Sequence, residues 1–424
     1  MRLDVHVRGN RVAQLYRERD EYVLKYSVNA GVDDFVSLAM PVQDEPWRWP
    51  RDLHPFFRQN LPEGSLLEII REEFGPLLDG TDLSLLAVVG GFGIGRVTIT
   101  PEGYKPDQLE PLDFTPLLTG ENSTARFMQL MRRYARAAIS GAVPKFLAPA
   151  EVVDAEPMGK ATLRTSRHII KGSDDAIPFL AFNEYYSLQV LERLNVVPVA
   201  KTRMSDDGRV LIVDRFDVDA QGTPIKGLED ACSLLGLAPT EKYRPSMEKV
   251  LKATRSYIGA ADVRQQLVQF GWHVLANYVV RNADCHSKNI ALLYDTHSDV
   301  GFTPIYDVVT TQAYPSFANR EPGLSIGGRK TWAPGKSLEQ FFKIELGISP
   351  ADYAVMVERL FESAVEVAKE LTIAAKDDIR WRETAENMIQ AWNEGMGSLR
   401  KPKGAVSRKG RRTVVGRSDL LGKR

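Results

Sequence analysis

A dense polar segment, Arg281-Asn-Ala-Asp-Cys-His-Ser-Lys-Asn289, constrains the fold of this 424-residue chain more than any other feature. It stands between residues 268–280, whose apolar spacing predicts a buried helix, and residues 290–294, which read as a buried strand. A further carboxylate, Asp307, follows eighteen residues after Asn289. Because buried elements flank the segment on both sides, we expect its polar side chains to be held rigidly, as a reaction site requires.

The spacing of these polar residues favours phosphoryl transfer. Asp284 and Asn289 have the Asp-x4-Asn spacing of a protein-kinase catalytic loop. In that scheme Asp284 orients the acceptor hydroxyl, while Asn289 and Asp307 supply the hard oxygen ligands that Mg²⁺ prefers. The pattern departs from protein kinases, because no His-Arg pair precedes Asp284 and Tyr306-Asp-Val308 replaces Asp-Phe-Gly. The alternative is a helix-ending turn followed by an ordinary loop carboxylate, since Asn and Asp favour turns.

Several segments, in the same order, resemble the HipA family of serine/threonine kinase toxins. Residues 282–289 resemble an N-x-D-x-H-x-K-N signature, and residues 304–307 resemble a P-x-Y-D metal segment. Similar agreement is found at residues 139–145, 167–171, 229–243 and, less closely, 56–64. The resemblance implies an α+β, two-lobed protein-kinase-like fold that uses ATP and Mg²⁺. It also implies a small N-terminal α+β subdomain and an all-helical C-terminal lobe.

The resemblance further implies a loop over the nucleotide phosphates at residues 139–145. Its predicted phosphate contacts are Ser140, Gly141, Ala142 and Lys145. Small residues suit this role because their backbone N–H groups can approach a phosphate closely. Relatives commonly carry a serine two positions before Ser140, and its autophosphorylation displaces the loop, but Ala138 stands there in this chain. This departure puts self-inactivation through that serine in doubt, while Ser140 stays open as a modification site.

The first lobe also contains a predicted lysine and its carboxylate partner. Residues 162–171 read as one strand with Ile170 toward the core, so that Lys171 faces the opposite side and contacts the α- and β-phosphates. The alternative is that Lys171, at the end of a strand, is exposed to solvent. Glu184, in a helix predicted over 181–194, is the candidate ion-pair partner; the alternative is a first-turn glutamate favoured by the helix dipole.

Other candidates have less specific signals. The apolar strand predicted over 209–216 ends in Asp214, Arg215 and Phe216, whose backbone we expect to bind adenine. His286 is interpreted as a support for Asp284 in the active site, as a phosphate contact or as a cap of the turn. Lys288 is interpreted either as a contact of the γ-phosphate or as an exposed side chain.

Composition and charge indicate an ordinary globular protein with an unusual end. Cys232 and Cys285 lack metal-ligand spacing and are expected to be reduced, as in a cytoplasm. Neither a signal peptide nor a long apolar run is apparent, so we predict no membrane span. Residues 400–424 hold ten Lys or Arg and one acid, which leaves a net charge of about −9 on residues 1–399. This basic tail is interpreted as disordered, or as a contact for nucleic acid or for the protein itself.

The N-terminal region reads as a separate small unit. Residues 2–7 and 22–26 alternate as antiparallel strands do, and the run Gly90–Gly95 is interpreted as a turn, because no helix follows it as a phosphate-binding fingerprint requires. The predicted domains are an N-terminal subdomain, a nucleotide-binding lobe, a helical catalytic lobe and the tail, at residues 1–110, 111–217, 218–398 and 399–424.

The sequence thus predicts an ATP- and Mg²⁺-dependent serine/threonine-protein kinase. The resemblance implies inhibition of growth through phosphorylation of a translation component, such as an aminoacyl-tRNA synthetase, and neutralisation by a DNA-binding, HipB-like antitoxin. Two alternatives stay open. One is a small-molecule or lipid kinase, which would use the same phosphate chemistry. The other is a non-catalytic partner of a DNA-binding repressor, which the basic tail favours and the Asp/Asn/Asp set opposes.

Overall fold

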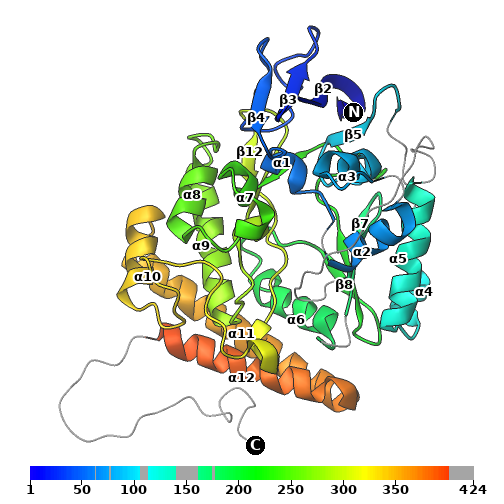
Figure 1. Ribbon diagram of the computed structural model, residues 1–424. Helices are drawn as coiled ribbons and strands as arrows, with labels where there is room; N and C mark the ends of the chain where they lie inside the picture. Colours follow the sequence, from blue (N-terminus) through cyan, green and yellow to red (C-terminus); the bar gives the residue numbers. More distant parts are fainter. Residues whose placement is uncertain (63, 76–77, 106–112, 140–160, 174–176, 401–424) are drawn as a thin grey trace, which may run out of the picture.

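The computed structural model describes residues 1–62, 64–75, 78–105, 113–139, 161–173 and 177–400. Figure 1 shows the N-terminal strands at one end of the molecule and two long helices, side by side, at the other. Three separate sheets and many helices make this an α+β fold, as the sequence predicts.

The N-terminal unit is built on a five-stranded antiparallel sheet of order β4-β3-β2-β1-β5. Its strands are β1 (Arg2–Val7), β2 (Asn10–Glu18), β3 (Glu21–Tyr26), β4 (Trp47–Pro50) and β5 (Val97–Pro101). Arg8 and Gly9, between β1 and β2, both adopt positive φ angles of 50° and 78°, as tight hairpin turns do. Helices α1 (Pro55–Arg58) and α3 (Asp82–Val89), followed by the 3₁₀ turn η2 (Gly90–Phe92), complete the unit. Leu3, Leu15 and Phe57 are among the residues of its core.

Helix α2 (Gly64–Phe74) follows this unit in sequence but packs elsewhere. Its Ile69 lies in a cluster with Phe127, Met131 and Leu163, which belong to the next lobe. Burial of these apolar side chains therefore joins the N-terminal part of the chain to the nucleotide-binding lobe.

The next lobe, which the sequence predicts to bind the nucleotide, contains a four-stranded antiparallel sheet of order β6-β7-β9-β8. Its elements are α4 (Thr115–Thr119), α5 (Thr124–Ile139), β6 (Ala161–Arg164), β7 (His168–Gly172), α6 (Leu180–Glu192), β8 (Thr202–Met204) and β9 (Val210–Asp214). The single strand predicted over 162–171 is wrong, because β6 and β7 form a hairpin there. Thr165 accounts for the break, since its hydroxyl accepts from His168 N at 3.0 Å and closes the turn.

The C-terminal lobe is mainly helical. Its principal helices are α8 (Met247–Arg255), α9 (Val263–Val279), α10 (Lys336–Gln340), α11 (Pro350–Asp377) and α12 (Arg382–Leu399). A π-helical turn, η7 (Phe341–Glu345), continues α10, and short 3₁₀ turns are found at η3 (Pro239–Glu241), η4 (Ser287–Asn289), η5 (Thr311–Ala313), η6 (Pro315–Phe317) and η8 (Ile379–Trp381). Apolar faces of α9, α11 and α12 meet in one core, in which Trp392 is fully buried.

The prediction that this lobe is entirely helical is wrong in one respect. Three short strands, β10 (Gly227–Asp230), β11 (Ala291–Tyr294) and β12 (Val300–Phe302), form a sheet in the order β10-β11-β12. After β10 the chain forms the short helix α7 (Ala231–Leu234), which Asp230 caps by accepting from Ser233 N at 2.7 Å. An apolar run this short fits either element, so periodicity could not separate them.

Among the residues that the structure describes, no helix is both long enough and apolar enough to cross a bilayer.

Candidate active site

The polar segment forms a tight loop directly after α9. Asn282 fixes its start, because its Nδ2 donates to Asn277 Oδ1 at 2.7 Å and its Oδ1 accepts from Asp284 N at 3.0 Å. Ala283 N donates to Thr311 Oγ1 at 2.7 Å. Asn282 and Ala283 are buried, so the loop is held by groups that water does not reach, which supports the expected rigidity.

Asp284, the predicted base, lies two residues after Asn282 in this loop and is half-exposed. One of its carboxylate oxygens, Oδ1, accepts a hydrogen bond from the hydroxyl of Tyr243. His286, the predicted support, is buried and packs edge-on against the same Tyr243 ring, with ring centroids 5.0 Å apart. Lys288 is half-buried, and its carbonyl oxygen accepts from the hydroxyl of Tyr306 at 2.9 Å.

Asn289 and Asp307 lie together, although eighteen residues separate them in sequence. Asn289 Nδ2 donates to Asp307 Oδ2 at 2.5 Å, while Asn289 Oδ1 accepts from His286 N at 3.0 Å. Asp307 takes a left-handed backbone conformation, with φ at 57°, which Asp tolerates better than most residues. Such a conformation is held by its surroundings and directs the carboxylate toward Asn289.

Lys171 joins the two lobes across the site. Its Nζ donates to Glu184 Oε1 at 2.6 Å and to Asp307 Oδ1 at 2.8 Å. Glu184 comes from α6 and is nearly buried, with 2% of its side chain exposed. The predicted lysine, its predicted glutamate partner and one predicted metal ligand thus meet at a single ammonium group, which a solvent-exposed strand-end lysine would not do.

The donor set can be compared with the needs of a magnesium ion. Asp307 offers carboxylate oxygens and Asn289 an amide oxygen, both of the hard type that Mg²⁺ binds. Two protein ligands suffice for Mg²⁺ beside a nucleotide, because it keeps water and phosphate oxygens as its other ligands. The described residues contain no group of three or more His, Cys, Asp or Glu able to hold a metal by themselves. The oxygen donors of Asp307 and Asn289 therefore suit an Mg²⁺ ion whose other ligands are water and phosphate oxygens.

Arg215, whose backbone is predicted to bind adenine, also connects two parts of the chain through its side chain. Arg215 binds Asp217 through two hydrogen bonds, at 2.6 and 3.0 Å, and donates to Gly93 O at 3.3 Å. Asp217 in turn accepts from Gly95 N at 2.7 Å. The glycine-rich run is therefore tied to the nucleotide lobe as a turn before β5, as interpreted from the sequence.

The backbone groups expected to bind adenine are partly engaged within the protein. Asp214 N donates to Lys201 O and Arg215 N to Arg167 O, each at 2.9 Å. The Phe216 ring stacks at a tilt against Tyr306, with centroids 5.9 Å apart. Of the predicted phosphate-covering loop, Ser140, Gly141, Ala142 and Lys145 lie outside the described residues.

Cys285 lies inside the polar loop but is unsuited to nucleophilic chemistry. It is buried, and desolvation raises the pKa of its thiol to about 12, with the nearby Asp284 and Asp307 carboxylates acting in the same direction. A thiol with this pKa stays protonated at neutral pH and is a poor nucleophile. This thiol is therefore not a candidate nucleophile.

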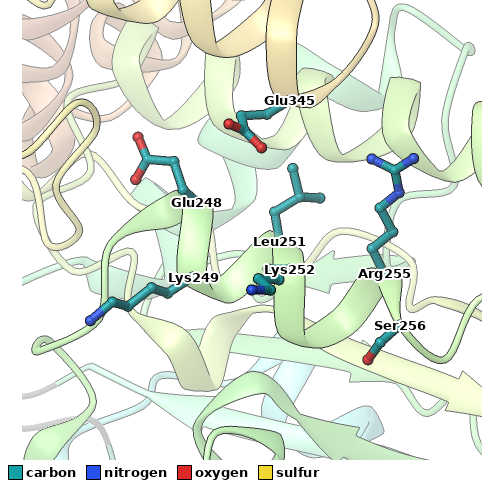
Figure 2. Close-up of a pocket in the computed structure, with 7 residues that line it drawn as sticks. All are labelled: Glu248, Lys249, Leu251, Lys252, Arg255, Ser256 and Glu345. Carbon is teal, nitrogen blue, oxygen red and sulfur yellow. The ribbon is translucent and has the colours of Figure 1, made fainter.

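A separate hollow of about 520 Å³ lies on α8, outside the candidate site. Figure 2 shows that Lys249, Lys252 and Arg255 extend from this helix and that Glu345 of η7 faces it. Glu248, at the same place, accepts from Gly327 N at 2.7 Å and so supports a loop. None of the residues predicted to act in catalysis lines this hollow.

Tyr243 is a site residue that the sequence reasoning missed. It ended one of the segments that resemble the HipA family, yet no chemistry was assigned to it. Its spacing from Asp284, forty-one residues, carries no periodic or motif signal. Only the folded chain shows that these two side chains meet.

Comparison with protein families gives two matches that follow one another along the chain. Residues 3–100 match the model of the HipA N-terminal domain, and residues 137–368 match that of the HipA-like C-terminal domain. The second match alone covers more than half of the 424 residues.

Curated relatives are named as kinases. "Putative kinase Y4mE" of Sinorhizobium fredii is 29% identical over 318 residues, which span 70% of this chain and 73% of that protein. A "Putative kinase" of Haemophilus influenzae is 25% identical over 166 residues, or 36% of this chain and 47% of that protein.

Among solved structures, the fold resembles HipA of Shewanella oneidensis, determined in complex with HipB and its operator DNA. The match covers 93% of this chain and 96% of that chain, with a TM-score of 0.67 and 17% sequence identity. At this identity the likeness concerns the fold.

Proposed function

The chain belongs to the HipA family, and from this premise we propose that it is an ATP- and Mg²⁺-dependent serine/threonine-protein kinase of the toxin type. The observation that carries the proposal is the position of Lys171 Nζ, 2.6 Å from Glu184 and 2.8 Å from Asp307. A lysine held by a helix glutamate beside a metal-binding aspartate is the arrangement with which kinases grip the phosphates of ATP.

In the proposed reaction Asp284 binds the acceptor hydroxyl of the substrate. As the hydroxyl oxygen forms its bond to the γ-phosphorus, the bond from that phosphorus to the β,γ-bridging oxygen breaks and ADP leaves. The hydroxyl proton passes to Asp284. Positioning and charge neutralisation supply most of the rate enhancement in such transfers, which explains why the loop around Asp284 is fixed so firmly.

The remaining residues hold the nucleotide. Asn289 and Asp307 would bind Mg²⁺, which neutralises negative charge on the phosphates when present. Lys171 would exchange part of its contact with Asp307 for phosphate oxygens, while Glu184 keeps the ammonium group in place. Because Glu184 is nearly buried, its attraction for Lys171 is little screened by solvent.

We further propose the biological setting of the family for this chain: a protein substrate from the translation apparatus, such as an aminoacyl-tRNA synthetase, and a HipB-like antitoxin that brings DNA into the complex. The Shewanella relative was solved with HipB and operator DNA, which supports such partners. A cytoplasmic location belongs to the same proposal.

Transfer of radiolabelled γ-phosphate from ATP in the presence of Mg²⁺ and a host lysate tests the proposal. We expect the wild type to label a protein on serine or threonine, and Asp307→Asn to reduce labelling at least about 10²-fold, because one preorganised charge is lost. Asp299→Asn is the matched control, since this exposed carboxylate of the same lobe contacts Lys226 and not the site.

Other outcomes would contradict the proposal. Label that enters a metabolite or lipid and no protein would assign the chain to small-molecule phosphorylation. Absence of any transfer by the wild type, together with tight binding to a DNA-bound repressor, would make it a non-catalytic partner.

A further inference from the structure

The segment from Glu229 to Tyr243 has no part in the proposed function so far, yet its last residues contact the catalytic loop. It begins in β10, passes through α7 and ends after η3. At this end, the hydroxyl of Tyr243 donates to Oδ1 of Asp284. The segment therefore reaches the carboxylate assigned as the base.

The contact is made by a residue whose ring and backbone are both held by neighbours. The Tyr243 ring packs edge-on against His286, with an interplanar angle of 75°. Lys330 Nζ donates to the Tyr243 carbonyl oxygen at 3.1 Å. A phenol fixed in this way can set the rotation of the carboxylate that it touches.

The orientation of this carboxylate matters for catalysis. An acceptor hydroxyl must approach the γ-phosphate within a narrow range of distance and angle, and a misplacement of about 1 Å can cost about 10²-fold in rate. A carboxylate on a two-bond side chain rotates freely unless a donor fixes it. A hydroxyl donor does this without placing a further charge beside the base.

We propose that Tyr243 is a positioning residue for phosphoryl transfer, which orients Asp284 toward the acceptor hydroxyl; this inference rests on the proposed kinase function. Tyr243 acts through Asp284 and has no contact of its own with the reacting atoms. It is expected to affect turnover and not the binding of Mg·ATP.

The loop that carries Tyr243 is anchored independently of its hydroxyl. Ser287 donates to Lys242 O through its backbone N–H at 3.1 Å and through its hydroxyl at 2.9 Å. These bonds and the contact from Lys330 involve backbone carbonyl groups, which a Tyr243→Phe substitution leaves in place. The substitution thus removes one hydrogen bond and keeps the ring against His286.

The experiment is a double-mutant cycle on the full-length chain, with wild type, Tyr243→Phe, Asp284→Asn and the double variant. Single-turnover transfer to the protein substrate is measured for each. We expect Tyr243→Phe to lower the rate of transfer about 10- to 100-fold, because the base is misoriented. In the Asp284→Asn background the same change should alter the rate less than about 2-fold, since the group that it orients is already gone.

Two further measurements separate orientation from general damage. For Tyr243→Phe, the dissociation constant for Mg·ATP and the midpoint of thermal unfolding should match those of the wild type. Tyr257→Phe is the matched control, because Tyr257 belongs to the same lobe but packs with the cluster around Phe35 and Leu292.

The outcomes of this experiment distinguish the positioning role of Tyr243 from the proposed kinase function. Absence of transfer by the wild type would overturn the proposed function. Wild-type rates in Asp284→Asn would overturn the assignment of Asp284 as the base, and the role of Tyr243 with it. Transfer that depends on Asp284 but is unchanged or faster in Tyr243→Phe would overturn the positioning role alone. An equal loss in both backgrounds would also overturn it, because Tyr243 would then act independently of Asp284.

Discussion

Two of the regions in which charged side chains are withdrawn from water differ in the partners that hold these side chains. One region is the contact between the N-terminal unit and the C-terminal lobe, where Glu229 is completely buried. Its carboxylate accepts from the Ser37 hydroxyl at 2.8 and 2.9 Å, from Leu38 N at 2.9 Å and from the Ser233 hydroxyl at 2.9 Å. Ser37 and Leu38 come from the N-terminal unit, so the carboxylate ties the two parts of the chain together.

Arg96, which belongs to the N-terminal unit, lies at the same contact and reaches toward the C-terminal lobe. Its guanidinium lies over the rings of Phe35 and Tyr294, at 4.4 and 5.3 Å from their centroids, and donates to the carbonyl oxygens of Phe35 and Asp295. The carboxyl group of Glu229 and the guanidinium of Arg96 are thus both held by groups of the protein itself.

The candidate active site holds its charges by contacts that a nucleotide and its metal ion could replace. The Asp307 carboxylate is bound by the ammonium of Lys171 and by the amide of Asn289. Phosphate oxygens could engage the ammonium group instead, and Mg²⁺ could engage the amide oxygen. The comparison teaches that burial of charge does not by itself identify a functional site. In these two regions the partners differ: Glu229 is held by neutral donors, whereas Asp307 is held in part by the opposite charge of Lys171.

The largest test of this contrast is Lys171→Met. We expect phosphate transfer to fall about 10²- to 10³-fold, because one charge aimed at the phosphates is removed. The free energy of unfolding should fall by about 1–3 kcal/mol, since the nearly buried Glu184 loses a donor. Steady-state transfer and urea unfolding measure the two effects. Lys369→Met, on the exposed face of α11, is the control. A variant that is destabilised but transfers phosphate normally would erase the distinction between the two regions.

The second test uses pH. Desolvation raises the pKa of Glu229 from 4.5 to about 7, although Ser37, Ser233 and Leu38 N favour the ionised form. The native state then binds the proton more tightly than the unfolded chain does. This contribution to stability is complete below pH 4.5 and is lost as pH rises through 7, by up to about 3 kcal/mol.

Unfolding free energies at pH 5 and pH 8 for the wild type and Glu229→Gln measure this effect. We expect the wild type to lose stability over this interval relative to the glutamine variant. Parallel pH profiles for the two proteins would show that Glu229 does not change protonation there.

The smallest expected effect belongs to Arg96→Lys. Lysine keeps the charge but loses the planar group that lies over Phe35 and Tyr294, so we expect a loss of about 1–2 kcal/mol in unfolding free energy. Transfer per folded molecule should be unchanged, in contrast to Lys171→Met. Arg48→Lys, at an exposed pair with Glu18 and Glu21, is the matched control. A fall in transfer rate would show that the contact around Arg96 and the candidate active site are coupled.

Sequence reasoning predicted much of the candidate site because several of its parts are local. Asp284 and Asn289 belong to one loop, whose ends are fixed by α9 and β11. The partnership of Lys171 with Glu184 followed from a strand and the next helix. Prediction from the sequence was less reliable for short elements. The hairpin β6–β7 and strand β10 depend on single polar residues and on neighbours distant in sequence.

The sequence by itself determined which residue types could carry phosphoryl chemistry and in what order they occur, because their spacing follows from the local geometry of a loop, a strand and a helix. Tertiary structure decided which of them meet. Asp307 reaches both Lys171 and Asn289, and Tyr243 reaches Asp284, through contacts between residues 18 to 136 positions apart. Such contacts arise from the packing of separate elements against a common core, and no local pattern encodes them.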